Sequence, residues 1–371
     1  MGTSPHESCG CKGARFCGLC ETSDRVKNLR IEGNKFESYQ IFIYDPTRNI
    51  GIPSQNLTSK SSLEEIISET QKSRDFSPDS CVKLNGLILI QNFLSNEEET
   101  DILDMIDRVD WAPSQSGRRK QDYGPKVNFK QKKVKTNTFV GMPEYADFLL
   151  DKMRNHNSEK LGNYQPFEMC NLEYEESKKS GIEMHKDDMW IWGNRLISIN
   201  LINGSVMTMT NDSTEQLCYV YMPHRSFLCM ADDARYQWSH GILPHHIRGR
   251  RIALTMREAG KDFQEGGELY EKYGAELIRL GNIHMCDEAE KMAKIGKIEY
   301  DLIKRHDSPE CDQHTKYECD LELAKYALMR SEMALKNVYN EEFVTPAKMR
   351  YLREDFEAAQ ENLRSLQMSP V

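Results

Sequence analysis

The region between residues 168 and 257 constrains the fold more than any other part of the chain. It consists of short apolar runs separated by polar turns, at 170–174, 196–202, 206–209, 217–222, 226–230 and 252–256. Several strands of this length at close spacing are typical of a sandwich or a barrel. We therefore predict a β core for this region.

The flanking segments predict helices and further strands around this core. Ser95 and Glu98 form a capping-box pattern that opens a helix with apolar positions from Ile102 to Val109. A second helix is expected at 145–153, and strands are expected at 39–44 and 84–90.

The remaining segments predict extensions on either side of the core. Residues 53–80 are Ser-rich and polar, and we expect a linker with a short helical patch at 63–67. Two apolar stripes, at 317–338 and 349–366 on either side of Pro346, predict a C-terminal helical hairpin. We divide the chain into a Cys-rich leader (1–35), a strand and linker (36–80), the core domain (81–265) and a helical extension (266–371).

His185, Asp187 and His240 are candidate metal ligands. Two imidazoles and one carboxylate from separate strands can bind one face of Fe(II) and leave the other face open for a co-substrate and O₂. A turn cap at Asp187 and a core histidine at His240 are the alternative interpretations. A double-stranded β-helix, or jelly roll, is the barrel that brings the three residues together with Arg251 at its mouth, so we predict an α+β chain with this core.

Arg251 and Arg257 lie at the two ends of an alternating apolar run. In a strand their side chains would share one face, about 20 Å apart. Guanidinium groups bind carboxylates bidentately. Two long side chains that lean inward predict a binding site for a short dicarboxylate such as 2-oxoglutarate.

The blocks around these residues resemble the AlkB family of Fe(II)/2-oxoglutarate dioxygenases. The matching blocks are Cys170-Asn-Leu-Glu-Tyr174 and His185-Lys-Asp-Asp-Met-Trp-Ile-Trp-Gly193. The block from Ser114 to Phe129 and the N-terminal cysteines narrow the resemblance to the AlkB homologue four subfamily, over about residues 9–280. Two departures stand out, because two residues separate Asn171 from Tyr174 where the family has one, in Asn-x-Tyr, and Ala253 replaces a usual Asn.

The resemblance implies a function and a set of site residues. It implies an oxidative demethylase in which His185, Asp187 and His240 hold Fe(II). The residues implied to contact 2-oxoglutarate are Arg251, Arg257 and Tyr174. The candidate substrate-binding residues are Arg118, Arg119, Tyr123 and Asp188, and a surface carboxylate is the alternative for Asp188.

The substrate class has three interpretations. The resemblance implies methylated lysine in protein, with actin or actomyosin as the partner, and we take this as the first expectation. N6-methyladenine in DNA is the alternative, for which Trp190, Trp192 and Tyr123 would supply a stacking platform. A catalytically weak scaffold that acts through its cysteine segment and helical tail is the third.

Cys9, Cys11, Cys17 and Cys20 form the pattern Cys-x-Cys-x5-Cys-x2-Cys. Four thiolates in one short loop suit tetrahedral Zn²⁺. A disordered, redox-sensitive leader and an iron–sulfur cluster are the alternatives.

The charge distribution bears on partners and location. The net charge of −9 argues against a protein that coats nucleic acid, yet residues 118–135 hold eight basic side chains against the single acid Asp122. Such a patch suits phosphates or an acidic protein surface. No apolar run is long enough to span a membrane and no secretory signal is present, so we expect no membrane partner and a cytoplasmic and nuclear location. The sequence leaves the oligomeric state open.

Overall fold

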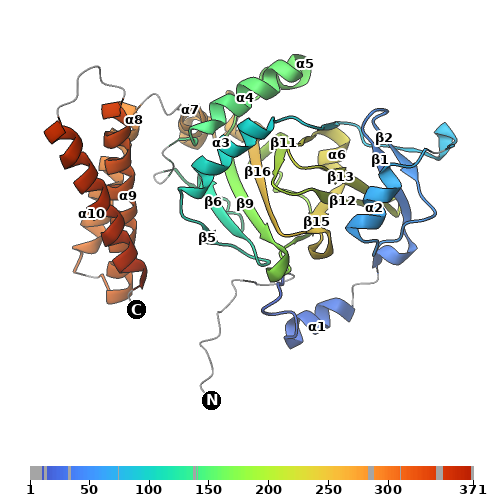
Figure 1. The fold of residues 1–371 in the computed structure, drawn as a ribbon, viewed down its shortest axis with the longest axis horizontal. Helices are drawn as coiled ribbons and strands as arrows, with labels where there is room; N and C mark the ends of the chain where they lie inside the picture. The colour runs from blue at the N-terminus through green and yellow to red at the C-terminus, as the bar shows by residue number, and fades with distance from the viewer. Residues whose placement is uncertain are drawn as a thin grey trace.

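Two seven-stranded sheets face each other at the centre of the computed structural model (Figure 1). The structure describes residues 11, 15–31, 35–73, 75–136, 139, 141–282, 288–309, 311–339 and 346–368. One sheet has the order β10-β15-β12-β13-β1-β2-β3, and the other has the order β4-β14-β11-β16-β9-β6-β5.

The eight strands of the core fall in the region that the apolar runs predicted. Their bounds are β9 Glu168–Glu175, β10 Ile182–His185, β11 Trp192–Leu201, β12 Ser205–Asn211, β13 Gln216–Met222, β14 Phe227–Met230, β15 Ser239–Ile242 and β16 Arg250–Ala259. The order β14-β11-β16-β9 in one sheet and β10-β15-β12-β13 in the other is that of a jelly roll. The predicted α+β chain with a double-stranded β-helix core is confirmed.

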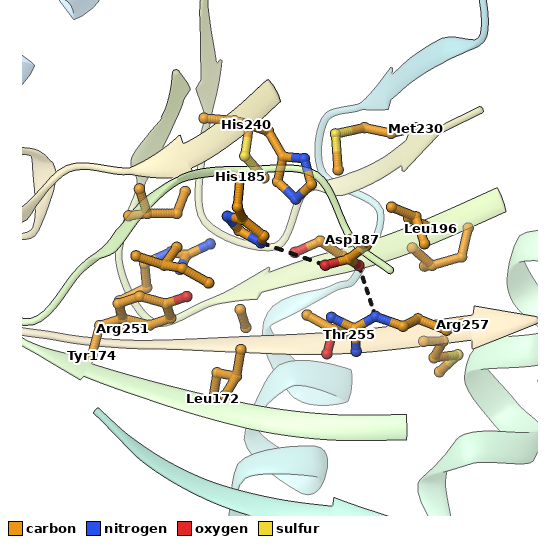
Figure 2. A pocket seen from close by; sticks show the side chains of 17 residues that line it. Leu172, Tyr174, His185, Asp187, Leu196, Met230, His240, Arg251, Thr255 and Arg257 are labelled. Carbon is orange, nitrogen blue, oxygen red and sulfur yellow. Dashed lines mark hydrogen bonds and ion pairs between the residues drawn. The ribbon is translucent and has the colours of Figure 1, made fainter. Parts of the chain in front are cut away.

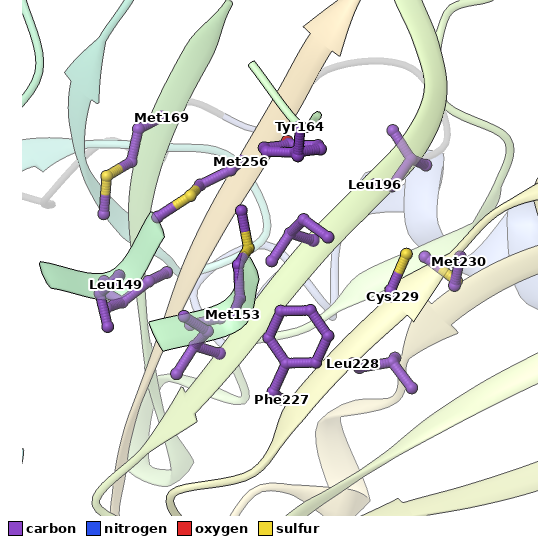
Figure 3. Packing of buried hydrophobic residues seen from close by; sticks show 14 of the residues in the cluster. Leu149, Met153, Tyr164, Met169, Leu196, Phe227, Leu228, Cys229, Met230 and Met256 are labelled. Carbon is purple, nitrogen blue, oxygen red and sulfur yellow. The ribbon is translucent and has the colours of Figure 1, made fainter. Parts of the chain in front are cut away.

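Strand β16 shows how the sequence pattern makes both the core and the site. Successive side chains of a strand point to opposite faces. Met256 is buried beside Leu149 and Met153 of the helix that covers the outer face (Figure 3). Arg251 and Arg257 therefore point to the inner face, toward the opposing sheet.

Two helices cover the outer face of the sheet that contains β9 and β16 (Figure 1). Helix α3 (Asn96–Asp107) begins at the predicted capping box, in which the Ser95 side chain accepts from the Glu98 amide and the Glu98 side chain accepts from the Ser95 amide. Helix α4 (Tyr145–His156) buries five side chains of one face. The short helix α5 (Ser158–Leu161) follows it.

Residues 40–70 are part of the folded core, which differs from the linker expected at 53–80. Strand β1 (Gln40–Asp45) pairs in parallel with β13, and β2 (Ile50–Pro53) and β3 (Val82–Lys83) extend the sheet. Helix α2 (Leu63–Thr70) buries Leu63 and Ile66 in a second hydrophobic cluster with β1 and β13. Its few apolar residues suffice because they fall on one face of the helix.

The C-terminal region contains three long helices where the sequence predicted two. They are α8 (Glu288–His306), α9 (Gln313–Tyr339) and α10 (Pro346–Met368). The predicted hairpin corresponds to α9 and α10, with Pro346 as the first residue of α10. Ile295 and Ile298 of α8 pack on Tyr326 and Met333 of α9, so α9 lies between its neighbours.

The core does not end at residue 265. Helix α7 (Ala275–Gly281) and a π-helical turn at Tyr270–Gly274 bury Leu277 and Leu280 against it. Beyond this point, the helical bundle lies at one end of the molecule in Figure 1, opposite β2 and α2.

The remaining described elements are short. They are α1 Asp24–Ile31, α6 Asp232–Tyr236, β4 Leu87–Ile90, β5 Ala112–Pro113, β6 Arg119–Tyr123, β7 Lys126–Asn128 and β8 Lys133–Lys135, with 3-10 turns at Lys35–Ser38, Pro78–Ser80, Glu176–Lys178, Pro244–His246 and Lys261–Phe263. Within the described ranges, no helix is both long and apolar enough to cross a bilayer.

Candidate active site

His185, Asp187 and His240 meet in the pocket between the two sheets (Figure 2). His185 at the end of β10 and His240 in β15 are direct antiparallel partners, which places both rings on one face. Their ring centroids lie 4.4 Å apart, and one ligand atom from each of the three residues falls within 4.8 Å of the others. Residues far apart in sequence thus form one cluster that fits an iron ion.

The protonation of this cluster suits metal binding. Nδ1 of His185 lies 2.8 Å from the Glu183 carbonyl, which can only accept, so this nitrogen donates and Nε2 faces the cluster as a ligand atom. Burial lowers the pKa of His240 to about 3 and keeps its imidazole neutral. Burial alone would raise the pKa of Asp187, but the Arg257 guanidinium and the His185 ring hold it well below its usual range.

Arg251 lies on one side of the cluster in Figure 2, beside Tyr174. It is 1% exposed, its Nε donates to Oδ1 of Asn200 at 2.5 Å, and its guanidinium lies 4.8 Å from the centre of the Tyr174 ring. Among the described residues, no partner accepts from Nη1 of Arg251. A buried cation with a free donor is costly, so the residues here fit the carboxylate of 2-oxoglutarate.

Arg257 lies on the other side and has two carboxylate partners. Its Nε donates to Oδ2 of Asp187 at 2.8 Å, and its Nη1 donates to Glu168 at 2.7 Å. These contacts differ from the expected role at the second end of 2-oxoglutarate. They orient Asp187 instead, with its other oxygen 3.4 Å from Nε2 of His185.

Asn171 and Tyr174, the two residues that depart from the family's Asn-x-Tyr spacing, lie on opposite faces of β9 because successive side chains of a strand alternate. Tyr174 and Leu172 line the pocket. Asn171 points to the other face, where its Nδ2 donates to Gln121 and to the Tyr145 hydroxyl. Leu172 and Ala253 therefore stand side by side as apolar residues next to the co-substrate site.

The four candidate substrate residues are not brought together. Arg118 is buried, 5.7 Å from the Tyr174 ring centre. Arg119 forms an ion pair with Glu173 on the outer face, and Tyr123 shares that face because β6 alternates. The Asp188 carboxylate caps a turn by accepting from the amides of Trp190 and Ile191.

Arg235 of α6 is a positioning residue that the sequence did not reveal. It is 1% exposed, and its guanidinium donates to the carbonyls of Asp187 and Asp188 at 3.0 Å each. A lone arginine in a polar helix carries no signal of such a role. The contacts hold the loop that presents the candidate metal ligand Asp187.

Arg235→Ala is expected to weaken Fe(II) affinity by about 10- to 100-fold, as is usual for groups that orient metal ligands. Titration of the apoprotein with Fe(II) under anaerobic conditions measures this. Arg279→Ala, which removes an exposed ion pair with Glu276, is the control. Equal Fe(II) affinities of the two variants would show that Arg235 does not position the candidate ligand Asp187.

A lysine-rich hairpin lies beside the site. Strands β7 and β8 pair, and between them Phe129 is 49% exposed with its ring 6.5 Å from that of Trp192. Trp192 in turn lies 5.6 Å from the Arg257 guanidinium. The hairpin exposes Lys126, Lys130, Lys132, Lys133 and Lys135. None of the five has a carboxylate within 4.0 Å among the residues described.

Three of the four motif cysteines also come together. Sγ atoms of Cys11, Cys17 and Cys20 lie within 4.8 Å of one another. Cys9 lies outside the described residues.

Comparison with known proteins identifies the family. No protein-family model matches the chain. The chain is 33% identical to the human alpha-ketoglutarate-dependent dioxygenase alkB homolog 4 over 73% of its own length and 92% of that protein. The chain belongs to the AlkB family. The mouse homolog 4 is 31% identical, over 74% of this chain and 93% of that protein, in agreement with the expected subfamily.

A further relative is more similar. A Caenorhabditis elegans protein named "DNA N6-methyl adenine demethylase" is 71% identical over 76% of this chain and 97% of that protein. The chain is therefore an AlkB-type dioxygenase whose cofactors are Fe(II) and 2-oxoglutarate (alpha-ketoglutarate).

Proposed function

We propose that this enzyme removes the methyl group of N6-methyladenine in DNA. The 71% identity to the C. elegans DNA N6-methyladenine demethylase is the observation that carries the proposal. This reverses the order expected from the sequence, in which methyl-lysine in actin came first, because no relative reported above has a protein substrate in its name.

We assign His185, Asp187 and His240 as the iron ligands and Arg251 with Tyr174 as the 2-oxoglutarate anchor. An iron ion held by these ligands would supply oxidation of the N–CH₃ group by O₂, with 2-oxoglutarate as the reductant that would leave as succinate and CO₂. The resulting N–CH₂OH would lose formaldehyde to give N–H. The protein's own contribution is positional. Arg251 offers a carboxylate its Nη1 donor, which has no acceptor among the described residues, and Arg257 orients Asp187. Apolar side chains such as Leu172 and Leu196 limit water in the pocket.

The lysine hairpin supplies the contact with DNA. Five exposed lysines, which have no carboxylate partner in the part of the chain that the structure describes, concentrate positive charge next to the pocket of a chain that carries −9 overall. Phosphate contacts hold a duplex in register but carry no sequence information. A methylated base in a duplex must leave the stack to reach the iron, and the half-exposed Phe129 beside Trp192 is an aromatic surface that can receive it.

Methyl-lysine in protein is the second candidate, because the resemblance to the AlkB homologue four subfamily implies it. A cationic side chain would be attracted to unpaired acids, and two carboxylates, Glu168 and Asp122, lie on the pocket-facing side of β9 and β6. Each is already paired, Glu168 with Arg257 and Asp122 with Lys120. This weakens the case for a cationic substrate.

Neutralising the hairpin tests the DNA assignment. Lys132→Gln/Lys133→Gln is expected to flatten the dependence of log K on log salt by about 1.4–1.8, since each lost phosphate contact removes about 0.7–0.9 from the slope. Binding to methylated oligonucleotides between 50 and 200 mM salt, about the range over which such contacts dominate, measures it. Lys83→Gln/Lys316→Gln changes the net charge equally at exposed positions outside the hairpin. Identical slopes for both variants would exclude the hairpin as the DNA contact.

A further inference from the structure

The N-terminal cysteines are the strongest site outside the dioxygenase pocket. Cys11, Cys17 and Cys20 place three sulfur atoms within 4.8 Å of one another. Tetrahedral Zn²⁺ with Zn–S bonds of about 2.3 Å separates its sulfur ligands by about 3.8 Å, so small adjustments suffice to close the cluster on one ion.

The surroundings of the sulfur atoms are those of metal-bound thiolates. Ser116 N donates to Sγ of Cys11 at 3.2 Å, and Sγ of Cys20 lies 3.4 Å from both Cys17 N and Nη2 of Arg25. Donors directed at ligand sulfur atoms orient them and stabilise their negative charge. Cys17 is only 2% exposed, which argues against a thiol that serves solvent redox chemistry.

The cluster is packed against the dioxygenase core. Gly18 N donates to the Lys178 carbonyl at 3.1 Å, and Gly181 N donates to the Ser116 carbonyl at 3.1 Å. Gly117 has φ +72°, and a Cβ there would lie 2.8 Å from the Lys178 carbonyl oxygen and 3.2 Å from Cβ of Cys17. The 114–118 loop and the cysteine segment therefore approach as closely as a residue without a side chain allows.

One carboxylate links the cluster to the iron ligands. Glu183 of β10 accepts from Phe16 N at 3.1 Å and from the Ser116 hydroxyl at 3.0 Å. The Glu183 carbonyl accepts from Nδ1 of His185. The cysteine segment thus contacts the residue that sets the orientation of a candidate iron ligand.

We propose that Cys11, Cys17 and Cys20 bind one Zn²⁺ ion that fastens the N-terminal segment to the 114–118 loop and to β10. Thiolate ligands favour zinc over the oxygen-preferring cations. The ion is distinct from the iron in position and in ligand type. The proposal goes beyond the demethylase activity and does not depend on the DNA substrate.

Metal analysis of the full-length protein, purified without chelators, tests the site. Wild type is expected to hold about one equivalent of zinc that a mercurial reagent releases. Cys20→Ser and Cys17→Ser are expected to lose most of it. Cys81→Ser, at a half-buried thiol elsewhere, is the control and keeps the zinc.

A second measurement separates loss of zinc from loss of fold. Cys20→Ser is expected to bind Fe(II) as wild type does and to show faster amide exchange at residues 114–118 and 178–183, with β12 and β13 unchanged. A wild-type protein without zinc, an absorbance and iron content typical of an iron–sulfur cluster, or a disulfide found by intact mass would each overturn the proposal. So would zinc that is retained in both Cys17→Ser and Cys20→Ser.

Discussion

Asp187→Asn is expected to lower both bound iron and succinate formation by more than about 100-fold while the fold is retained. The variant keeps the shape of the side chain but removes the single carboxylate of the cluster and its ion pair with Arg257. Loss of a metal ligand exceeds the effect of about 10- to 100-fold that is usual for groups behind the ligands. Iron content after anaerobic loading and succinate release are the measurements.

The neighbouring carboxylate provides a matched control. Asp188→Asn keeps the oxygen that accepts from the amides of Trp190 and Ile191, so iron and turnover should stay near wild type. Undiminished turnover by Asp187→Asn and by His185→Ala would show that these residues do not bind the catalytic iron.

Arg251→Ala is expected to raise the concentration of 2-oxoglutarate needed for half-maximal turnover by two to four orders of magnitude. Breaking one side of a buried ion pair costs roughly 3–5 kcal/mol, and each tenfold change in affinity corresponds to about 1.4 kcal/mol. Arg251→Lys should recover part of the affinity, because it restores the charge without the bidentate fork. Titration of 2-oxoglutarate with succinate as the readout measures both variants.

The neighbouring Arg250 provides the control for this prediction, because successive side chains of a strand point to opposite faces. Arg250 is adjacent in sequence but points to the outer face, where it pairs with Asp107 and Glu173. Arg250→Ala is expected to leave the 2-oxoglutarate requirement unchanged. If Arg251→Ala does the same, the anchor lies elsewhere in the pocket.

The strands of the core and the candidate iron ligands could be predicted from the sequence. The signals for the strands are local, and those for the ligands also match motifs of the AlkB family. The apolar runs alternate in β16, and the capping box marks the start of α3. Only one residue separates His185 from Asp187, so these two candidate ligands must lie close together in any fold.

The residues around the site could not be predicted because their roles depend on pairing between distant strands. The register of β6 against β9 decides that Arg119 and Tyr123 face outward, and a shift by one residue would reverse every side chain. Likewise, the Arg257–Glu168 pair is a cross-strand contact. Nothing in the local sequence of Arg235 indicates that it folds back on the loop of Asp187.

The helical bundle and the first strands illustrate a different limit. The strand expected at 39–44 is β1, but its parallel partner β13 lies far along the chain. Helix α2, inside the polar segment that reads as a linker, is held in place by packing on β1 and β13. Helix α8 is as amphipathic as α9 and α10, so its apolar stripe is a signal that the sequence carries. Its packing on α9 becomes visible only in three dimensions.

The most direct test of the central claim uses an oligonucleotide that carries N6-(¹³C-methyl)-2′-deoxyadenosine. The full-length enzyme is incubated with Fe(II), 2-oxoglutarate and O₂, and labelled formaldehyde, succinate and unmodified adenine are quantified by mass spectrometry. We expect the three products in equal amounts, and none of them from Asp187→Asn. Succinate without labelled formaldehyde from DNA, together with formaldehyde from methyl-lysine protein, would contradict the assigned substrate.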